Sequence, residues 1–271
     1  MKLLWITDPH LDHLDGEGLK AWLKRLEQHD GDGVLITGDI AESDSVCAFL
    51  EQCCSVATPI WFVLGNHDAY GSSIDDTQQR LRRLTDQVEG LHYLTFEEPF
   101  EYAPGEYLIG EDGWADGRAG DFLASDIMLN DYRHIDELKE LTHASRFEVL
   151  KRLGDQAAQR LEGQLQILRS NVVRHITIAT HVPPFAEACW YQGSNEINAW
   201  TPHFTAVAVG HVLRRAATNR PDVEFIVLCG HTHHAGRVRI LPNLTIVTGD
   251  ADYGDWRRGD SICLPMRHFA I

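Results

Sequence analysis

Three histidines crowd the segment LCGHTHHAG, residues 228–236. Imidazole is the commonest metal-binding side chain, so His231, His233 and His234 are candidate ligands. The spacing alone does not decide, because three histidines in four positions also suit a solvated polar turn. A metal site here needs further ligands from distant parts of the chain, each placed where a strand ends and a loop begins.

Polar residues directly follow five short apolar runs, 3–7, 34–37, 60–64, 176–180 and 225–229. Continuous apolar runs rich in β-branched residues are typical of strands in a sheet that is covered on both faces. Ligands bind in the crevice beyond the carboxyl ends of such strands, so we expect the polar residues to converge there. These residues are Asp8, His10, Asp39, Asn66, His67, Asp68, His181, His231 and His233.

The donors in this set are carboxylate and amide oxygens together with imidazole nitrogens. Such a mixture suits Mn, Fe or Zn, whereas an all-oxygen set would suit Mg or Ca. One carboxylate can bridge two ions, and two ions polarise a phosphoryl group and generate hydroxide at neutral pH. The residues therefore predict two divalent metal ions and the hydrolysis of a phosphate ester.

The elements that must position these residues alternate between strand and helix, as in an α/β fold. Helix-like stretches cover 19–28, 45–54, 77–88 and 203–219, and RVRI and LTIVT around the turn LPN predict closing antiparallel strands. Residues 97–171 break the rhythm, because FEYAPGEYLIG predicts a hairpin and 126–170 two or three amphipathic helices. We expect a single domain, 1–271, with a helical cap insertion at about 97–171.

The blocks DPH, GD, GNHD, the lone His181 and GHTH occur in this order. As a set they resemble the signature of the calcineurin-like metallophosphoesterase superfamily. The resemblance implies an α/β fold in which helices flank a two-sheet mixed β sandwich, giving four layers. It also implies that Asp8, His10 and His233 bind the first metal ion, that Asn66, His181 and His231 bind the second, and that Asp39 bridges the two ions.

His67 directly follows the ligand Asn66, and the resemblance implies that it contacts the phosphate and protonates the leaving group. At the spacing of the family aspartate that orients this histidine the chain has Glu42, and Asp68 competes for the same role. Both remain candidate catalytic residues. His234 is expected to be a surface group or to lie behind the ligands, because neighbours in an extended segment point in opposite directions.

The substrate class is narrowed by the second block, which reads GDIAES where protein serine/threonine phosphatases have GDxVDRG. The pattern is nearer to the branch that contains small phosphodiesterases. The segment after His181 is expected to overhang the metal ions, where Trp190, Tyr191 and Trp200 could stack on a nucleobase and Asn195 and Asn198 could bind its edge. Aromatic side chains that simply cover the cap are the alternative.

The net charge of -16 opposes binding to long nucleic acids, since phosphate contacts need a basic surface. No apolar run is long enough to span a membrane, and six cysteines without CxxC pairs favour reduced thiols and a cytoplasmic protein. The predicted activity is direct hydrolysis of a small phosphodiester, with a phosphomonoesterase as the alternative and a non-catalytic scaffold of the same fold behind it. The oligomeric state is not indicated by the sequence.

Overall fold

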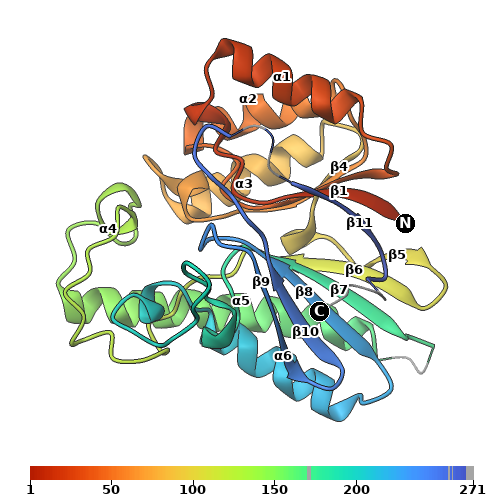
Figure 1. The fold of residues 1–271 in the computed structure, drawn as a ribbon. Coiled ribbons are helices and arrows are strands. Elements are labelled where there is room, and N and C mark those ends of the chain that lie inside the picture. Colours follow the sequence, from red (N-terminus) through yellow and green to blue (C-terminus); the bar gives the residue numbers. More distant parts are fainter. Residues whose placement is uncertain (170–171, 256, 258, 267–271) are drawn as a thin grey trace.

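Two β-sheets stack face to face, and helices cover both outer sides of the stack (Figure 1). The computed structural model describes residues 1–169, 172–255, 257 and 259–266. The predicted end of the cap insertion, residues 170 and 171, lies outside the described residues.

The first sheet has the strand order β11-β1-β2-β3-β4. Its strands β1 to β4 run parallel, and β11 pairs antiparallel with β1. Side chains alternate between the two faces of each strand, so Leu4 and Ile6 of β1 face the helices while Leu3 and Trp5 face the other sheet. The strands are β1 (Lys2–Ile6), β2 (Gly33–Thr37), β3 (Ile60–Val63), β4 (Leu91–Tyr93) and β11 (Asp260–Cys263).

The second sheet has the order β5-β6-β7-β8-β10-β9. Strands β6, β7, β8 and β10 are parallel, and β5 and β9 close the two edges in antiparallel pairs. The predicted antiparallel ending around LPN is confirmed by the pairing of β9 with β10. The strands are β5 (Phe100–Ala103), β6 (Glu106–Glu111), β7 (His175–Thr180), β8 (Glu224–Cys229), β9 (Gly236–Leu241) and β10 (Leu244–Thr248).

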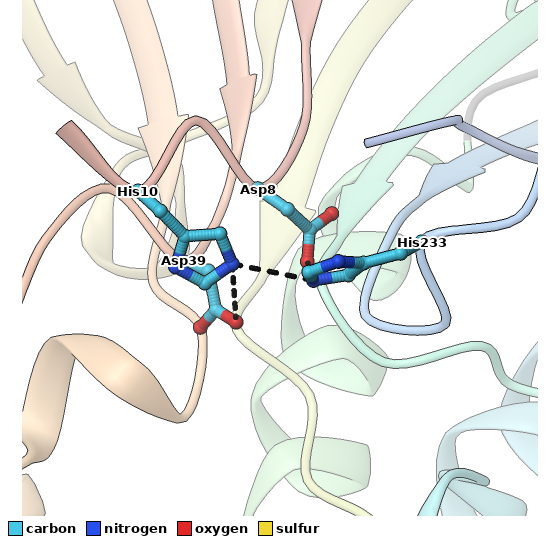
Figure 2. Close-up of side chains that lie close together, drawn as sticks. All are labelled: Asp8, His10, Asp39 and His233. Atoms are coloured by element: carbon cyan, nitrogen blue, oxygen red, sulfur yellow. Dashed lines mark hydrogen bonds and ion pairs between the residues drawn. The ribbon is translucent and has the colours of Figure 1, made fainter. Parts of the chain in front are cut away.

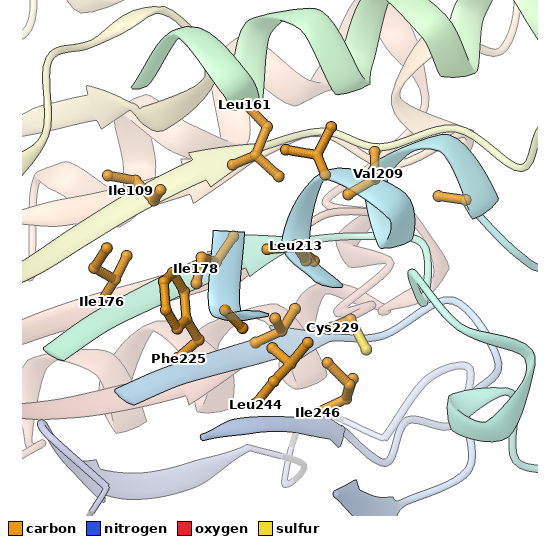
Figure 3. Packing of buried hydrophobic residues seen from close by; sticks show 14 of the residues in the cluster. Ile109, Leu161, Ile176, Ile178, Val209, Leu213, Phe225, Cys229, Leu244 and Ile246 are labelled. Atoms are coloured by element: carbon orange, nitrogen blue, oxygen red, sulfur yellow. The ribbon is translucent and has the colours of Figure 1, made fainter. Parts of the chain in front are cut away.

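The helices form the two outer layers. Helices α1 (Gly16–Glu27), α2 (Ser43–Cys54) and α3 (Ile74–Thr85) pack on the first sheet through one buried cluster that includes Trp22, Leu50 and Leu81. Helices α5 (His143–Ile167) and α6 (Val207–Asn219) cover the second sheet, where Leu161 and Val209 meet strand residues such as Ile178 (Figure 3). A third cluster fills the space between the sheets. The predicted four-layer α/β sandwich is therefore present.

The predicted cap insertion at about 97–171 differs from the observed arrangement. Strands β5 and β6 belong to the second sheet, and α5 is one long helix that packs against that sheet and α6. Between them, residues 112–142 hold one short helix, α4 (Asp131–His134), and otherwise irregular backbone. The hairpin was predicted correctly, whereas the two or three amphipathic helices expected over 126–170 are the short α4 and the single long α5. Leu161 of α5 packs in the core of the second sheet, but Leu150 and Leu153 pack in a separate buried cluster with side chains of 112–142.

A buried carboxylate ties the two sheets together behind the site. Asp112, at the end of β6, accepts hydrogen bonds from the Leu64 amide at 2.8 Å, the Tyr93 hydroxyl at 2.6 Å and the Thr95 hydroxyl at 2.8 Å. The Gln78 amide donates to it at 2.9 Å. Because β3 and β4 belong to the first sheet and β6 to the second, these bonds fix how the strand ends of the two sheets face each other.

Two further expectations concern the chain as a whole. In the described part of the chain, no helix combines the length and the apolar character that crossing a membrane requires. All six cysteines are free thiols, among which Cys53 and Cys229 are buried and Cys263 is exposed.

Candidate dinuclear metal centre

Loops at the carboxyl ends of five parallel strands carry the predicted ligands. Asp8 and His10 follow β1, Asp39 follows β2 and Asn66 follows β3 in the first sheet. His181 follows β7, and the pair in GHTH follows β8, in the second sheet. The candidate site therefore lies across one end of the sandwich, where both sheets contribute side chains.

The backbone at these loops is unusual. Among the residues that the structure describes, seven non-glycine residues have a positive φ, and five of these are predicted ligands. Residues other than glycine rarely adopt this left-handed backbone conformation, and those that do tend to lie at functional sites. The neighbouring glycines are required by close approach, because a Cβ at Gly38 would lie 2.5 Å from His181 Nδ1 and one at Gly230 would overlap Asp8. The five ligands are Asp8, His10, Asp39, His231 and His233.

The first ligand cluster comprises Asp8, His10, Asp39 and His233 (Figure 2). One ligand atom from each residue lies within 4.8 Å of the others. His10 Nε2 is 3.2 Å from His233 Nε2 and 3.8 Å from Asp39 Oδ2. His233 Nε2 is also 3.4 Å from Asp8 Oδ1. Two imidazole nitrogens and two carboxylates thus surround one small space, as the ligands of a single ion do.

The second ligand cluster shares Asp39 with the first and adds His181 and His231, again within 4.8 Å of one another. His181 Nε2 is 3.4 Å from Asp39 Oδ1 and 3.1 Å from Asn66 Oδ1. The shared carboxylate is the geometry expected of a bridging ligand, with Oδ2 facing the first cluster and Oδ1 facing the second.

The orientation of the ligands fits metal binding. His181 Nδ1 lies 2.9 Å from the Thr37 carbonyl oxygen, so this nitrogen carries the proton and the Nε2 lone pair is free for an ion. Both Asp8 oxygens accept the His231 backbone amide, at 3.0 and 3.1 Å, and Asp39 Oδ1 accepts the His67 amide at 2.9 Å. These bonds hold the carboxylates in place before an ion arrives.

The electrostatics of the cluster also favour cations. Burial and the charge of Asp8 raise the pKa of Asp39. For Asp8 itself burial acts upward, but the hydrogen bond from His233 and the nearby imidazoles outweigh it and lower its pKa. Burial lowers the pKa of His10 to about 2, which keeps that ring neutral as metal binding requires. Two buried carboxylates whose ion-pair partners among the described residues are histidines are best compensated by bound cations.

His67 lies beside the clusters without belonging to either of them. Its Nε2 is 4.0 Å from Asp39 Oδ2, and its side chain is 16% exposed. Its ring stacks on Tyr70 with 4.3 Å between centroids, and burial lowers its pKa to about 3. This is a position from which an imidazole can meet a phosphate held between the clusters.

Neither proposed orienting residue contacts the His67 ring. Asp68 is fully buried, and its oxygens accept the backbone amides of Ile40 at 2.8 Å, Ala41 at 3.0 Å and Gly65 at 2.7 Å. Glu42 is exposed and stands at the N-cap of α2. The Nδ1 atom of His67 is buried and has no hydrogen-bond partner among the described residues. Asp68 therefore organises the loops, and the geometry gives Glu42 no role at this histidine.

Two side chains near the ligands were not found from the sequence. Asp131 accepts a hydrogen bond from Asn66 Nδ2 at 2.8 Å, and the Tyr253 ring lies 4.4 Å from the His10 ring. Neither residue belongs to a motif, so only the fold reveals them. His234 lies outside both clusters and packs edge-on against Tyr191, as its alternating position predicted.

The segment after His181 forms a pocket of about 520 Å³ next to the second cluster. Trp190, Tyr191, Trp200 and Phe204 line it, and the Phe204 ring is 4.5 Å from the His231 ring. The two side-chain amides predicted to bind a base edge instead donate hydrogen bonds to backbone carbonyls of their own segment. Asn195 Nδ2 donates to the Glu187 carbonyl at 2.6 Å, and Asn198 Nδ2 to the Glu196 carbonyl at 3.2 Å.

A layered α/β sandwich with two ligand clusters that share one carboxylate is the arrangement of a protein with a dinuclear metal centre. More specifically, the family model of the calcineurin-like phosphoesterases matches residues 1–235, and the chain belongs to this family. The family and the two clusters together support metal-dependent hydrolysis of phosphate esters.

Solved structures share the fold at low sequence identity. Phosphopantetheinyl hydrolase from Mycobacterium tuberculosis is 14% identical with a TM-score of 0.68, over 100% of this chain and 98% of that one. A dimetal phosphatase from Danio rerio is 17% identical with a TM-score of 0.54, over 92% of this chain and 87% of that one. A search of curated proteins found no match.

Proposed function

We propose that this protein hydrolyses a small phosphodiester, and that a planar group of the substrate lies in the pocket beside the second ligand cluster. The observation that carries the proposal is the pocket itself. Tyr191 and Trp200 are 62% and 52% exposed there, whereas large aromatic side chains usually bury most of their surface. Thr232, between the ligands His231 and His233, is part of the same lining. A phosphate at the clusters would therefore have one substituent directed toward aromatic faces.

The predicted ligand roles belong to this proposal. Asp8, His10 and His233 would hold one ion, Asn66, His181 and His231 would hold the other, and Asp39 would be the ligand common to both. When bound, two ions such as Mn, Fe or Zn polarise the phosphoryl group and supply hydroxide at neutral pH.

His67 handles the leaving group in this proposal. Its Nε2 faces Asp39 and the ligand clusters, and the negative charge of a bound phosphate favours the protonated imidazole. That proton is then donated from Nε2 to the departing oxygen. No covalent intermediate with the protein is needed in this proposal, because hydroxide takes the place of a side-chain nucleophile.

A phosphomonoesterase is the second candidate, because the same ligands and His67 serve a monoester equally well. The pocket favours the diester, since a monoester would leave one of the two substituent positions empty. A non-catalytic scaffold would be expected to lose ligands, whereas all seven predicted ligands lie at the site.

The deciding experiment compares bis(4-nitrophenyl) phosphate with 4-nitrophenyl phosphate, each with added Mn²⁺, Fe²⁺ or Zn²⁺. We expect the diester to be hydrolysed at least as fast as the monoester. Nucleotide diesters and a phosphopantetheinyl ester belong in the same panel, the latter because a protein of this fold is named for that substrate. A strong preference for monoesters would favour the phosphomonoesterase instead.

Variants of the pocket test its role. Trp200→Ala should raise KM for a nucleotide diester more than for a small aryl diester, because contacts made equally in ground and transition states act on KM. Phe100→Ala, a partly exposed aromatic on the edge strand β5, is the matched control and should leave both KM values unchanged. If Trp200→Ala changes KM equally for both substrates, the pocket is not part of the substrate-binding site.

Partner and location complete the proposal. The net charge of -16 supports a small phosphate ester over a long nucleic acid as the natural ligand. Six free thiols are compatible with the proposed cytoplasmic location.

A further inference from the structure

A buried carboxylate from outside the signature motifs holds the amide of Asn66. Asp131, at the start of α4, accepts a hydrogen bond from Asn66 Nδ2 at 2.8 Å. The Tyr70 hydroxyl donates to the same Asp131 oxygen at 2.6 Å. All three side chains are buried, with exposed fractions of 6 to 7%.

This contact determines which end of the amide faces the metal site. An asparagine amide has one accepting oxygen and one donating nitrogen, and it can flip between two orientations of similar shape. A carboxylate accepts hydrogen bonds, so Asp131 selects the orientation in which Nδ2 points toward it. Asn66 Oδ1 then points toward His181 Nε2, 3.1 Å away, where a ligand oxygen is needed.

Tyr70 connects the Asp131 carboxylate with His67. Its hydroxyl fixes the Asp131 oxygen that Asn66 uses, and its ring stacks on His67 at 4.3 Å and 26°. The Tyr70 side chain thus restrains both Asp131, the hydrogen-bond partner of Asn66, and the ring of His67. Loss of the hydroxyl alone would leave the stack on His67 in place.

We propose that Asp131 is a positioning residue for the second metal ion, acting through the amide of Asn66, with Tyr70 fixing the carboxylate. The inference rests on the ligand roles proposed above. It gives the segment 112–142, which follows β6, a function, because that segment supplies a carboxylate from outside the signature motifs. Residues behind the ligands typically change metal affinity by about 10- to 100-fold when they are replaced.

The test is a titration of the metal-free protein with Mn²⁺, followed by isothermal calorimetry. The unchanged protein should bind two ions per chain. Asp131→Ala should bind the first ion normally and the second about 10- to 100-fold more weakly. Asp136→Ala, an exposed carboxylate of the same segment paired with Lys139, is the matched control and should bind both ions normally. Unaltered affinity for both ions in Asp131→Ala would overturn the inference.

An exchange of the two partners separates positioning from general loss of structure. Asn66→Asp alone places two carboxylates against each other and should weaken the second ion. Asn66→Asp combined with Asp131→Asn restores a donor–acceptor pair and keeps an oxygen toward His181. This double variant should therefore bind the second ion at least tenfold more tightly than Asn66→Asp alone. A double variant that binds the second ion no better than Asn66→Asp would contradict the inference. This comparison still decides the matter if Asp131→Ala fails to fold.

The two proposals fail in different ways. If the unchanged protein binds fewer than two ions, the ligand roles and with them the role of Asp131 are wrong. If it binds two ions and Asp131→Ala binds both with unaltered affinity, only the positioning role is wrong, and the phosphodiesterase proposal is unaffected.

Discussion

Asp68 is predicted to stabilise the loops that carry the ligands, and replacing it separates this role from an action on His67. Its Oδ1 accepts the amides of Ile40 and Ala41, and its Oδ2 accepts the amide of Gly65. Asp68→Asn keeps an oxygen for the first two donors but directs an NH₂ group at the third. Asp68→Ala leaves all three buried donors without this partner.

The magnitude follows from the number of donors that lose their partner. A buried donor left unsatisfied costs about 1–3 kcal/mol, so Asp68→Asn should lower the free energy of unfolding by about 2 kcal/mol. Asp68→Ala should lower it by about 4 kcal/mol or more on the same basis. Asp86→Asn, at an exposed aspartate after α3, is the control and should stay within about 0.5 kcal/mol.

Urea unfolding measures the stability, and hydrolysis of a nitrophenyl ester and an alkyl ester measures the role at His67. We expect the rate of Asp68→Asn to fall by the same factor on both esters, since its contacts go to the loop backbone. A larger loss on the alkyl ester, together with a stability change below about 0.5 kcal/mol, would refute the reasoning and return Asp68 to the role of orienting His67.

Three further outcomes follow from the site and its surroundings. His67→Ala should cost about 10²–10⁴ in rate on an alkyl ester and far less on a nitrophenyl ester while both ions stay bound; an equal loss would make His67 a phosphate-positioning group. Asp112→Ala should lower the free energy of unfolding by about 3 kcal/mol or more in urea, because it leaves buried donors of both sheets unpaired, and a change below about 0.5 kcal/mol would contradict that role. Burial lowers the pKa of His203 to about 4, so the stability given by its neutral ring is complete above pH 6.5 and is lost as the pH falls toward 4. His203→Gln should reduce this acid-induced loss of unfolding free energy by up to about 3 kcal/mol, whereas the exposed control His211→Gln should leave it unchanged. Equal acid sensitivity of the two variants would contradict the lowered pKa of His203.

The ligand set could be predicted because each ligand follows a strand. A buried parallel strand is a continuous apolar run, and the polar residue after it must lie at the edge of the sheet. Asp39 and His181 were found in this way, and the structure brings both to the shared centre of the two clusters. The assignment of each ligand to one ion came from the resemblance to the metallophosphoesterase superfamily, because local periodicity alone could not provide it.

The packing of α5 could not be predicted, because amphipathic patterns do not say which surface a helix covers. The apolar face of α5 has the same period whether it packs on a separate cap or on the second sheet. Asp131 was missed for a related reason. An aspartate in an irregular loop is usually a solvated turn residue, and only the approach of α4 to Asn66 shows that its carboxylate is buried.

The number of bound metal ions tests the central claim most directly. Elemental analysis of the purified protein, loaded with Mn²⁺, Fe²⁺ or Zn²⁺, should give two ions per chain. Asp39→Asn should bind less than one ion and be nearly inactive, because it weakens the carboxylate shared by both clusters. His234→Ala, outside both clusters, should keep two ions and most of the activity. Full activity with a single ion per chain, or equal metal loss in these two variants, would contradict the dinuclear site.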